Sequence, residues 1–166
     1  RYYLKKLLIR MNTVDHDNSN LFMGLALELA HTAFDNDEVP VGAVIVQRRN
    51  SEVLAAFSNQ MRGIQSSIAH AEMLAIQKAM QVIHNERLID CDMYVSLEPC
   101  PMCAQAISFA RIKNLHFAAE DKKSGGVLNG PKIFESSSCH HRPEVFSGMM
   151  AEESSQLLKK FFKSKR

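Results

Sequence analysis

Two short segments of the sequence carry residue types that bind metals. They are His70-Ala71-Glu72 and Pro99-Cys100-Pro101-Met102-Cys103, and each is expected where a helix begins. Cysteines three positions apart on one helical turn can direct their sulfurs to one point. The partial positive charge of a helix N-terminus favours the thiolate form of such cysteines. With His70 as a nitrogen ligand, the sequence predicts a Cys2His zinc site whose fourth position is left to water.

Glu72 is placed to act on that water without binding the metal. It lies two residues from His70 in the sequence, at the start of the same helix. A carboxylate there can take a proton from the attacking water and return it to a leaving nitrogen, as a general base and then a general acid. This combination predicts a hydrolytic enzyme.

A Cys-x-x-Cys pair also fits other chemistry, such as a redox pair or half of a structural zinc site. A structural site would take its further ligand from Cys91, Cys139, His140 or His141. Cys91 comes just before an expected strand and is interpreted as a small buried side chain. The cluster at 139–141 lies in a polar loop without a partner at ligand spacing, and it stays open as an alternative.

The elements that must position these residues follow from hydrophobic periodicity. A continuous β-branched run at 41–46 predicts a central strand buried on both faces. Further strands are expected at 52–58, 93–97, 115–118 and, weakly, near Val145. Helices are expected from a cap at Ser19 or Asn20 to the polar run at 35–38, and at 69–83, 100–110 and 151–162. In the helix at 69–83 the inward-facing residues are expected to be Leu74, Ala75, Ala79 and Val82. The segments 119–132 and 136–143 are expected to be loops.

Composition places the chain among ordinary globular domains. Of 166 residues, 46% are hydrophobic and 23% charged, and the formal net charge is +2. An anionic partner must therefore meet a local basic patch. Four cysteines are too few for a disulfide scaffold, which indicates a reducing compartment, and we expect the cytoplasm. No run of 18 apolar residues occurs, so no membrane partner is expected.

The chain is expected to hold one domain, residues 19–166, that includes a basic C-terminal helix. Residues 1–18 are interpreted as an N-terminal arm outside the fold. Its first ten residues carry four basic groups and precede Met11. They fit upstream sequence, vector-derived residues or a short targeting arm.

The two metal-binding segments together form a more specific pattern than either alone. His-x-Glu, 26 intervening residues and Pro-Cys-x-x-Cys resemble the signature of zinc nucleobase deaminases. Over nearly all of residues 19–166 the chain resembles the cytidine-deaminase-like superfamily, and within it the bacterial tRNA-specific adenosine deaminases. The resemblance implies a three-layer α/β/α sandwich with a mixed five-stranded sheet. It also implies one Zn2+ per subunit held by His70, Cys100 and Cys103, with Glu72 as the catalytic proton shuttle.

The same resemblance implies a substrate and a set of residues that bind it. Glu38-Val39-Pro40-Val41-Gly42-Ala43 matches the family's first-strand motif, and residues 119–125 resemble a loop that touches RNA. The implied reaction converts the wobble adenosine of a tRNA anticodon loop to inosine, in a cytoplasmic homodimer. Ser66-Ser67-Ile68 and Ala118 depart from the family's usual residues and leave the zinc motif intact. The residues implied to bind substrate are Val41, Asn59, the Ala71 backbone, Asp121, Lys123 and Phe162.

The C-terminal tail at 157–166 holds five basic groups and no acid, which suits contacts with phosphate. Phe161 is expected in the core, whereas Phe162 fits either stacking on RNA or core packing. Two alternative functions remain open on the sequence. One is deamination of a free base or nucleotide, of guanine, cytosine or cytidine type. The other is a non-catalytic RNA-binding subunit with a structural zinc, against which the presence of Glu72 argues.

Overall fold

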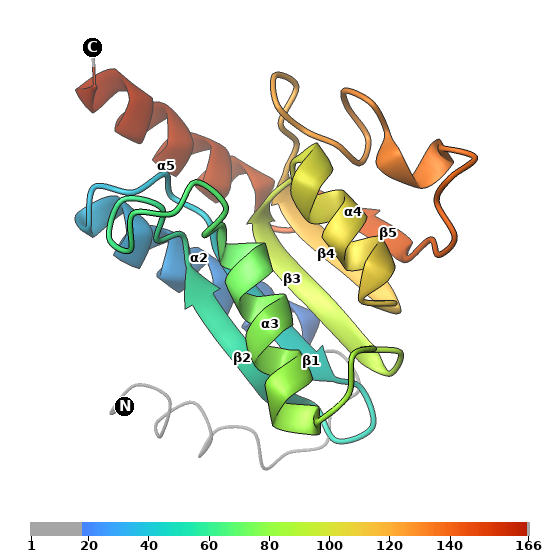
Figure 1. The fold of residues 1–166 in the computed structure, drawn as a ribbon. Helices are drawn as coiled ribbons and strands as arrows, with labels where there is room; N and C mark the ends of the chain where they lie inside the picture. Colours follow the sequence, from blue (N-terminus) through green and yellow to red (C-terminus); the bar gives the residue numbers. More distant parts are fainter. Residues whose placement is uncertain (1–17, 166) are drawn as a thin grey trace.

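The computed structural model describes residues 18–165 of the chain (Figure 1). The expected N-terminal arm therefore lies outside the described residues, except for Asn18. Among the described residues, none of the helices combines the length and the apolar character that a membrane span requires.

The centre of the fold is a mixed sheet of five strands in the order β2-β1-β3-β4-β5. The strand β1 pairs in antiparallel fashion with both β2 and β3, whereas β3-β4 and β4-β5 pair in parallel. This arrangement confirms the predicted five-stranded mixed sheet. The strands are β1 (Gly42–Gln47), β2 (Glu52–Ser58), β3 (Cys91–Leu97), β4 (Asn114–Ala119) and β5 (Glu144–Ser147).

Helices cover both faces of the sheet. In Figure 1 helices α3 and α4 lie side by side in front of the strands, and α2 and α5 lie behind them. The predicted three-layer α/β/α sandwich is thereby confirmed. The bounds are α2 (Ser19–Asp35), α3 (Ala71–Ile83), α4 (Pro101–Phe109) and α5 (Ala151–Ser164), with a short 3-10 helix η1 (Ile133–Glu135) that was not predicted.

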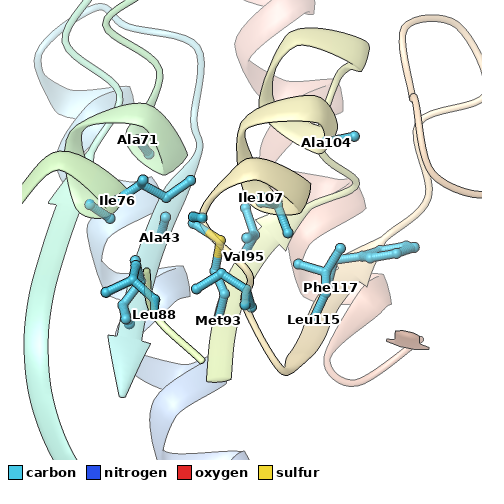
Figure 2. Packing of buried hydrophobic residues seen from close by; sticks show 14 of the residues in the cluster. Ala43, Ala71, Ile76, Leu88, Met93, Val95, Ala104, Ile107, Leu115 and Phe117 are labelled. Carbon is cyan, nitrogen blue, oxygen red and sulfur yellow. The ribbon is translucent and has the colours of Figure 1, made fainter. Parts of the chain in front are cut away.

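The strand β1 is buried on both faces, as its β-branched run predicts. Ala43 and Ile45 belong to the core between the sheet and the pair α3 and α4, whereas Val44 and Val46 pack with α2. Figure 2 shows the first core, with Ile107 of α4 beside Val95 of β3. Packing of helices on both faces of this central strand therefore determines the positions of the N-termini of α3 and α4.

Two local predictions were wrong. Val82 is 43% exposed. The buried face of α3 runs through Ala71, Ala75 and Ala79, at every fourth residue, so the next position on that face is 83 and not 82. Neither Ser19 nor Asn20 caps α2, since Asn18 is the N-cap and makes no side-chain cap bond. The Ser19 hydroxyl instead lies 3.2 Å from the Tyr94 hydroxyl, a partner that only the folded chain supplies.

Gly42 leaves room for α2 to pack closely on the sheet. A Cβ atom built there would lie 2.1 Å from the Ala26 carbonyl oxygen and 2.6 Å from the Leu29 Cβ. We expect Gly42→Ala to lower the free energy of unfolding by about 1–3 kcal/mol, since α2 must shift outward. Gly24→Ala is the matched control, because nothing lies within 4 Å of its added Cβ, and alanine there gains about 0.5–1 kcal/mol of helix propensity. Urea unfolding measures both, and a Gly42→Ala protein as stable as wild type would contradict this packing.

Candidate active site

The two helices on the front face begin at residues that carry metal-binding atoms. His70 is the N-cap of α3 and Cys100 the N-cap of α4, and both have extended backbones (φ −67°, ψ 149° and φ −68°, ψ 169°). Pro101 occupies the first turn of α4, where its missing N–H has no helical partner. Both helix starts therefore present their side chains to one point.

The ligand atoms of His70, Cys100 and Cys103 lie within 4.8 Å of one another. The His70 Nδ1 atom is 3.7 Å from the Cys100 sulfur and 3.5 Å from the Cys103 sulfur. A tetrahedral zinc with ordinary Zn–S and Zn–N bonds separates such atoms by about 3.6 Å. Within residues 18–165 this is the one group of three or more His, Cys, Asp or Glu side chains found at metal-binding distances, and its geometry fits Zn2+.

The charges in the cluster also suit a metal ligand set. A hydrogen bond from Cys103 and another from His70 lower the pKa of the Cys100 thiol to about 4. The Cys103 pKa is raised, because its proton bonds to Cys100 and because its side chain is buried. One thiolate is thus already formed at the helix N-terminus, and a dication can displace the proton that remains on Cys103.

Glu72 lies beside this cluster in the first turn of α3 and is only 3% exposed. Burial raises its pKa to about 7, while a bond from its own backbone amide and the charge of His70 oppose the rise. A carboxyl group with a pKa near neutrality can both accept and donate a proton at ordinary pH. The arrangement suits an acid–base group.

A cavity of about 260 Å³ opens onto the cluster and Glu72. Four residues that the sequence implied for substrate binding line this cavity, namely Val41, Asn59, Asp121 and Phe162. Ala71 is fully buried at the first position of α3, where a backbone N–H has no helical partner. Lys123 is exposed and does not line the cavity. The other lining residues, which the sequence had not named individually as substrate-binding, are Val39, Met61, Leu97, Glu98, Ser124 and Leu158.

Phe162 and Phe161 have different surroundings, and these show which of the two rings belongs to the core. Phe161 is buried against Phe34 in an edge-on contact, whereas Phe162 is 47% exposed at the cavity. The prediction that Phe161 is in the core is confirmed. Phe162 is not in the core, and its ring contacts that of Phe161 edge-on.

The alternative metal ligands do not join the cluster. Cys91 is buried within β3, as predicted for a small apolar side chain. The Cys139 thiol donates to the His141 carbonyl oxygen at 3.0 Å, and the His141 Nε2 atom lies 2.6 Å from the Ile112 carbonyl oxygen. His140 is exposed. The structure therefore gives no support to a four-ligand structural site.

The sequence did not show the hydrogen-bonding roles of two buried carboxylates near the cavity. Glu38 accepts hydrogen bonds from the backbone N–H groups of Arg62 at 2.6 Å and Gly63 at 2.9 Å. Glu98 accepts them from the segment 121–129, and although burial raises its pKa, bonds from Asn129 and its neighbours hold that pKa below the usual value. For Glu98, the signal available in the sequence was an acidic residue directly between an expected strand and Pro99-Cys100.

The fold and the cluster together define a class, a zinc-binding deaminase domain of the cytidine deaminase type. Residues 16–119 match the family described as "Cytidine and deoxycytidylate deaminase zinc-binding region". This match covers more than half of the chain and includes all three residues of the cluster.

Comparison with individual relatives narrows the class. The tRNA-specific adenosine deaminase of Agrobacterium fabrum is 46% identical over 145 residues, which are 87% of this chain and 94% of that protein. The one of Aquifex aeolicus is 40% identical over 145 residues, with the same coverage of both chains. The chain belongs to the family of the tRNA-specific adenosine deaminases.

Solved structures agree with this placement. A structure from "Biochemical and Structural Studies of A-to-I Editing by tRNA:A34 Deaminases at the Wobble Position of Transfer RNA" has a TM-score of 0.80 and 46% identity. The alignment covers 82% of this chain and 98% of that one. A guanine deaminase from Nitrosomonas europaea aligns at a TM-score of 0.74 with 23% identity, over 86% of this chain and 83% of the other, which shows a shared fold alone.

Proposed function

We propose that this protein catalyses the hydrolytic deamination of the wobble adenosine to inosine in a tRNA anticodon loop. The observation that carries the proposal is one cavity that places the His70–Cys100–Cys103 cluster and Glu72 against Asn59. The names of relatives that are 40–46% identical support the substrate.

His70, Cys100 and Cys103 would hold one Zn2+ per subunit. When bound there, the metal supplies a Lewis acid that lowers the pKa of water toward neutrality. Glu72 takes one proton from the water that attacks the amino-bearing carbon of adenine. It then gives that proton to the amino nitrogen, which leaves as ammonia. The water oxygen remains as the exocyclic carbonyl oxygen of inosine, and the second water proton ends on the adjacent ring nitrogen. The raised pKa of Glu72 suits both transfers.

The remaining cavity residues bind and orient the base. Val41 packs against the ring, Asn59 hydrogen-bonds its edge, and the Ala71 backbone N–H donates from the start of α3. Asp121 and Lys123 belong to the loop that meets the RNA backbone. An unpaired anticodon base reaches such a cavity without the cost of melting a duplex.

A direct test compares substrates for the zinc-loaded protein. The first is an anticodon stem-loop with adenosine at the wobble position, and the others are free adenosine, guanine and cytidine. We expect inosine in the stem-loop and no product from the free compounds. Turnover of a free base or nucleoside alone would overturn the substrate, and no turnover with zinc bound would favour the binding-subunit alternative.

Phe162 is proposed to stack on RNA, and its neighbour provides the comparison. We expect Phe162→Ala to raise KM for the stem-loop by about 10-fold or more at unchanged stability, since a stacked base contributes about 1–3 kcal/mol. Phe161→Ala should instead lower the free energy of unfolding by about 3–5 kcal/mol, because its ring is in the core. Steady-state kinetics and urea unfolding distinguish the two, and unchanged KM in Phe162→Ala would contradict the stacking role.

A homodimer and a cytoplasmic location complete the proposal. The cytoplasmic location is supported by the four cysteines, which are all free in the structure, and by the tRNA named for the relatives. Phe109, 70% exposed at the end of α4, offers apolar surface that a second copy would bury. Sedimentation equilibrium of the purified protein measures the mass, and a monomer throughout the micromolar range would contradict the dimer.

A further inference from the structure

The segment 121–129, here called the 121–129 loop, forms one wall of the cavity and rests on the start of α4. Asp121 and Ser124 line the cavity. The Gly126 N–H donates to the Pro99 carbonyl oxygen at 2.8 Å, directly before Cys100. A Cβ at Gly126 would lie 2.5 Å from the Pro101 nitrogen, so the loop touches the turn that carries the metal-binding cysteine.

Glu98 is the centre of the hydrogen bonds that hold this loop. Its Oε1 atom accepts from three successive backbone N–H groups, those of residues 127, 128 and 129, at 3.1, 2.8 and 2.9 Å. Its Oε2 atom accepts from the Asp121 N–H at 2.9 Å and from the Asn129 Nδ2 atom at 2.7 Å. Successive N–H groups that converge in this way form a nest for an anion, and the side chain of Glu98 supplies that anion.

The loop approaches Glu98 too closely for a side chain to lie between them. A Cβ at Gly125 would lie 2.5 Å from the Glu98 Cδ atom and 2.5 Å from the Asp121 carbonyl oxygen. Glu98 is itself only 3% exposed and directly follows β3, where its backbone N–H donates to the Ala119 carbonyl oxygen of β4 at 2.8 Å. The sheet therefore sets the position of the loop through one carboxylate.

We propose that Glu98 is the positioning residue for the substrate wall of the cavity. It fixes the 121–129 loop so that Asp121 and Ser124 meet the bound nucleotide, and it takes no part in proton transfer. This inference rests on the function proposed above. Asp121 is oriented within the loop by bonds from the Lys123 and Ser124 N–H groups to its Oδ1 atom, so its direction follows that of the loop backbone.

The test replaces Glu98 with glutamine, which keeps the shape but turns an NH2 group toward N–H donors. Glu135→Gln is the matched control, because this exposed acid follows the loop on η1 and its carboxylate pairs with Lys132 on the surface. Amide hydrogen exchange of zinc-loaded protein is measured first and needs no substrate. In Glu98→Gln the amides of Asp121, Val127, Leu128 and Asn129 should exchange at least about tenfold faster than in the wild type and the control. Unchanged exchange at these amides would overturn the proposal.

Kinetics on the anticodon stem-loop separate positioning from a general loss of structure. We expect KM to rise by at least about tenfold while kcat changes less than about threefold, with zinc content equal to that of the wild type. A fall in kcat at unchanged KM, or KM equal to that of Glu135→Gln, would overturn the proposal. If the wild type itself does not deaminate the stem-loop, the proposed function fails, and the exchange result still decides whether Glu98 holds the loop.

Gly125→Ala provides a second variant that leaves the carboxylate intact. Its added Cβ would push the loop away from Glu98. It should reproduce the faster exchange and the raised KM, also when Glu98→Gln does not fold. A Gly125→Ala protein with wild-type exchange and wild-type KM would contradict the role of this contact.

Discussion

Replacing Glu72 with glutamine is expected to lower kcat for the anticodon stem-loop by about 10²–10⁴-fold, the usual contribution of a positioned acid–base group. Glutamine keeps the volume of this buried side chain but cannot accept a proton from water or return it to the leaving nitrogen. Zinc content should stay at the wild-type value, because Glu72 is outside the group of ligand atoms. Elemental analysis and single-turnover assays measure the two quantities on the same preparation.

The comparison for this prediction is Glu28→Gln on the exposed face of α2, which should retain wild-type turnover. Glu72→Ala should also bind zinc without turnover. A Glu72→Gln protein that contains zinc and remains active would remove Glu72 from the mechanism.

Cys100→Ser should lose the metal and stability together. A serine hydroxyl does not ionise near neutral pH, whereas the Cys100 thiol has a pKa of about 4 in its place at the start of α4. Where the Kd of the wild type for zinc is about 100-fold to 1,000-fold below the free zinc concentration, loss of zinc binding lowers the free energy of unfolding by about 3–4 kcal/mol. Thermal unfolding with and without added zinc measures this difference, and zinc should no longer raise Tm in the variant.

Cys139→Ser is the matched control for the loss of a thiol. Cys139 is buried and donates to the His141 carbonyl oxygen, a bond that a serine hydroxyl can also make. It should keep zinc and most of its stability. A Cys100→Ser protein that is fully metallated and stable would refute the ligand assignment, and zinc loss in Cys139→Ser would revive the loop at 139–141 as a ligand source.

The sequence alone determined the features that depend on neighbouring residues. A continuous β-branched run at 41–46 predicted a strand buried on both faces, because each face of a strand is read from alternate residues. His70, Cys100 and Cys103 could be singled out because metal binding demands particular side chains, and two helix starts concentrate them locally. Two predictions from local patterns were nevertheless wrong. Val82 is exposed to solvent, and the Ser19 hydroxyl contacts the Tyr94 hydroxyl instead of capping α2.

Only the tertiary structure decided which polar groups meet across the chain. Whether Cys139 or His141 could complete a metal site depended on where the loop at 139–141 lies, and there both have partners of their own. The roles of Glu38 and Glu98 depend on backbone amides 23 to 31 residues away in sequence. Every residue except proline carries the same backbone N–H, so no pattern of side chains shows which amides will converge on a buried carboxylate. That convergence is a property of the packed sheet and loops, which is why the acid–base pattern was visible in the sequence and the carboxylate that holds the cavity wall was not.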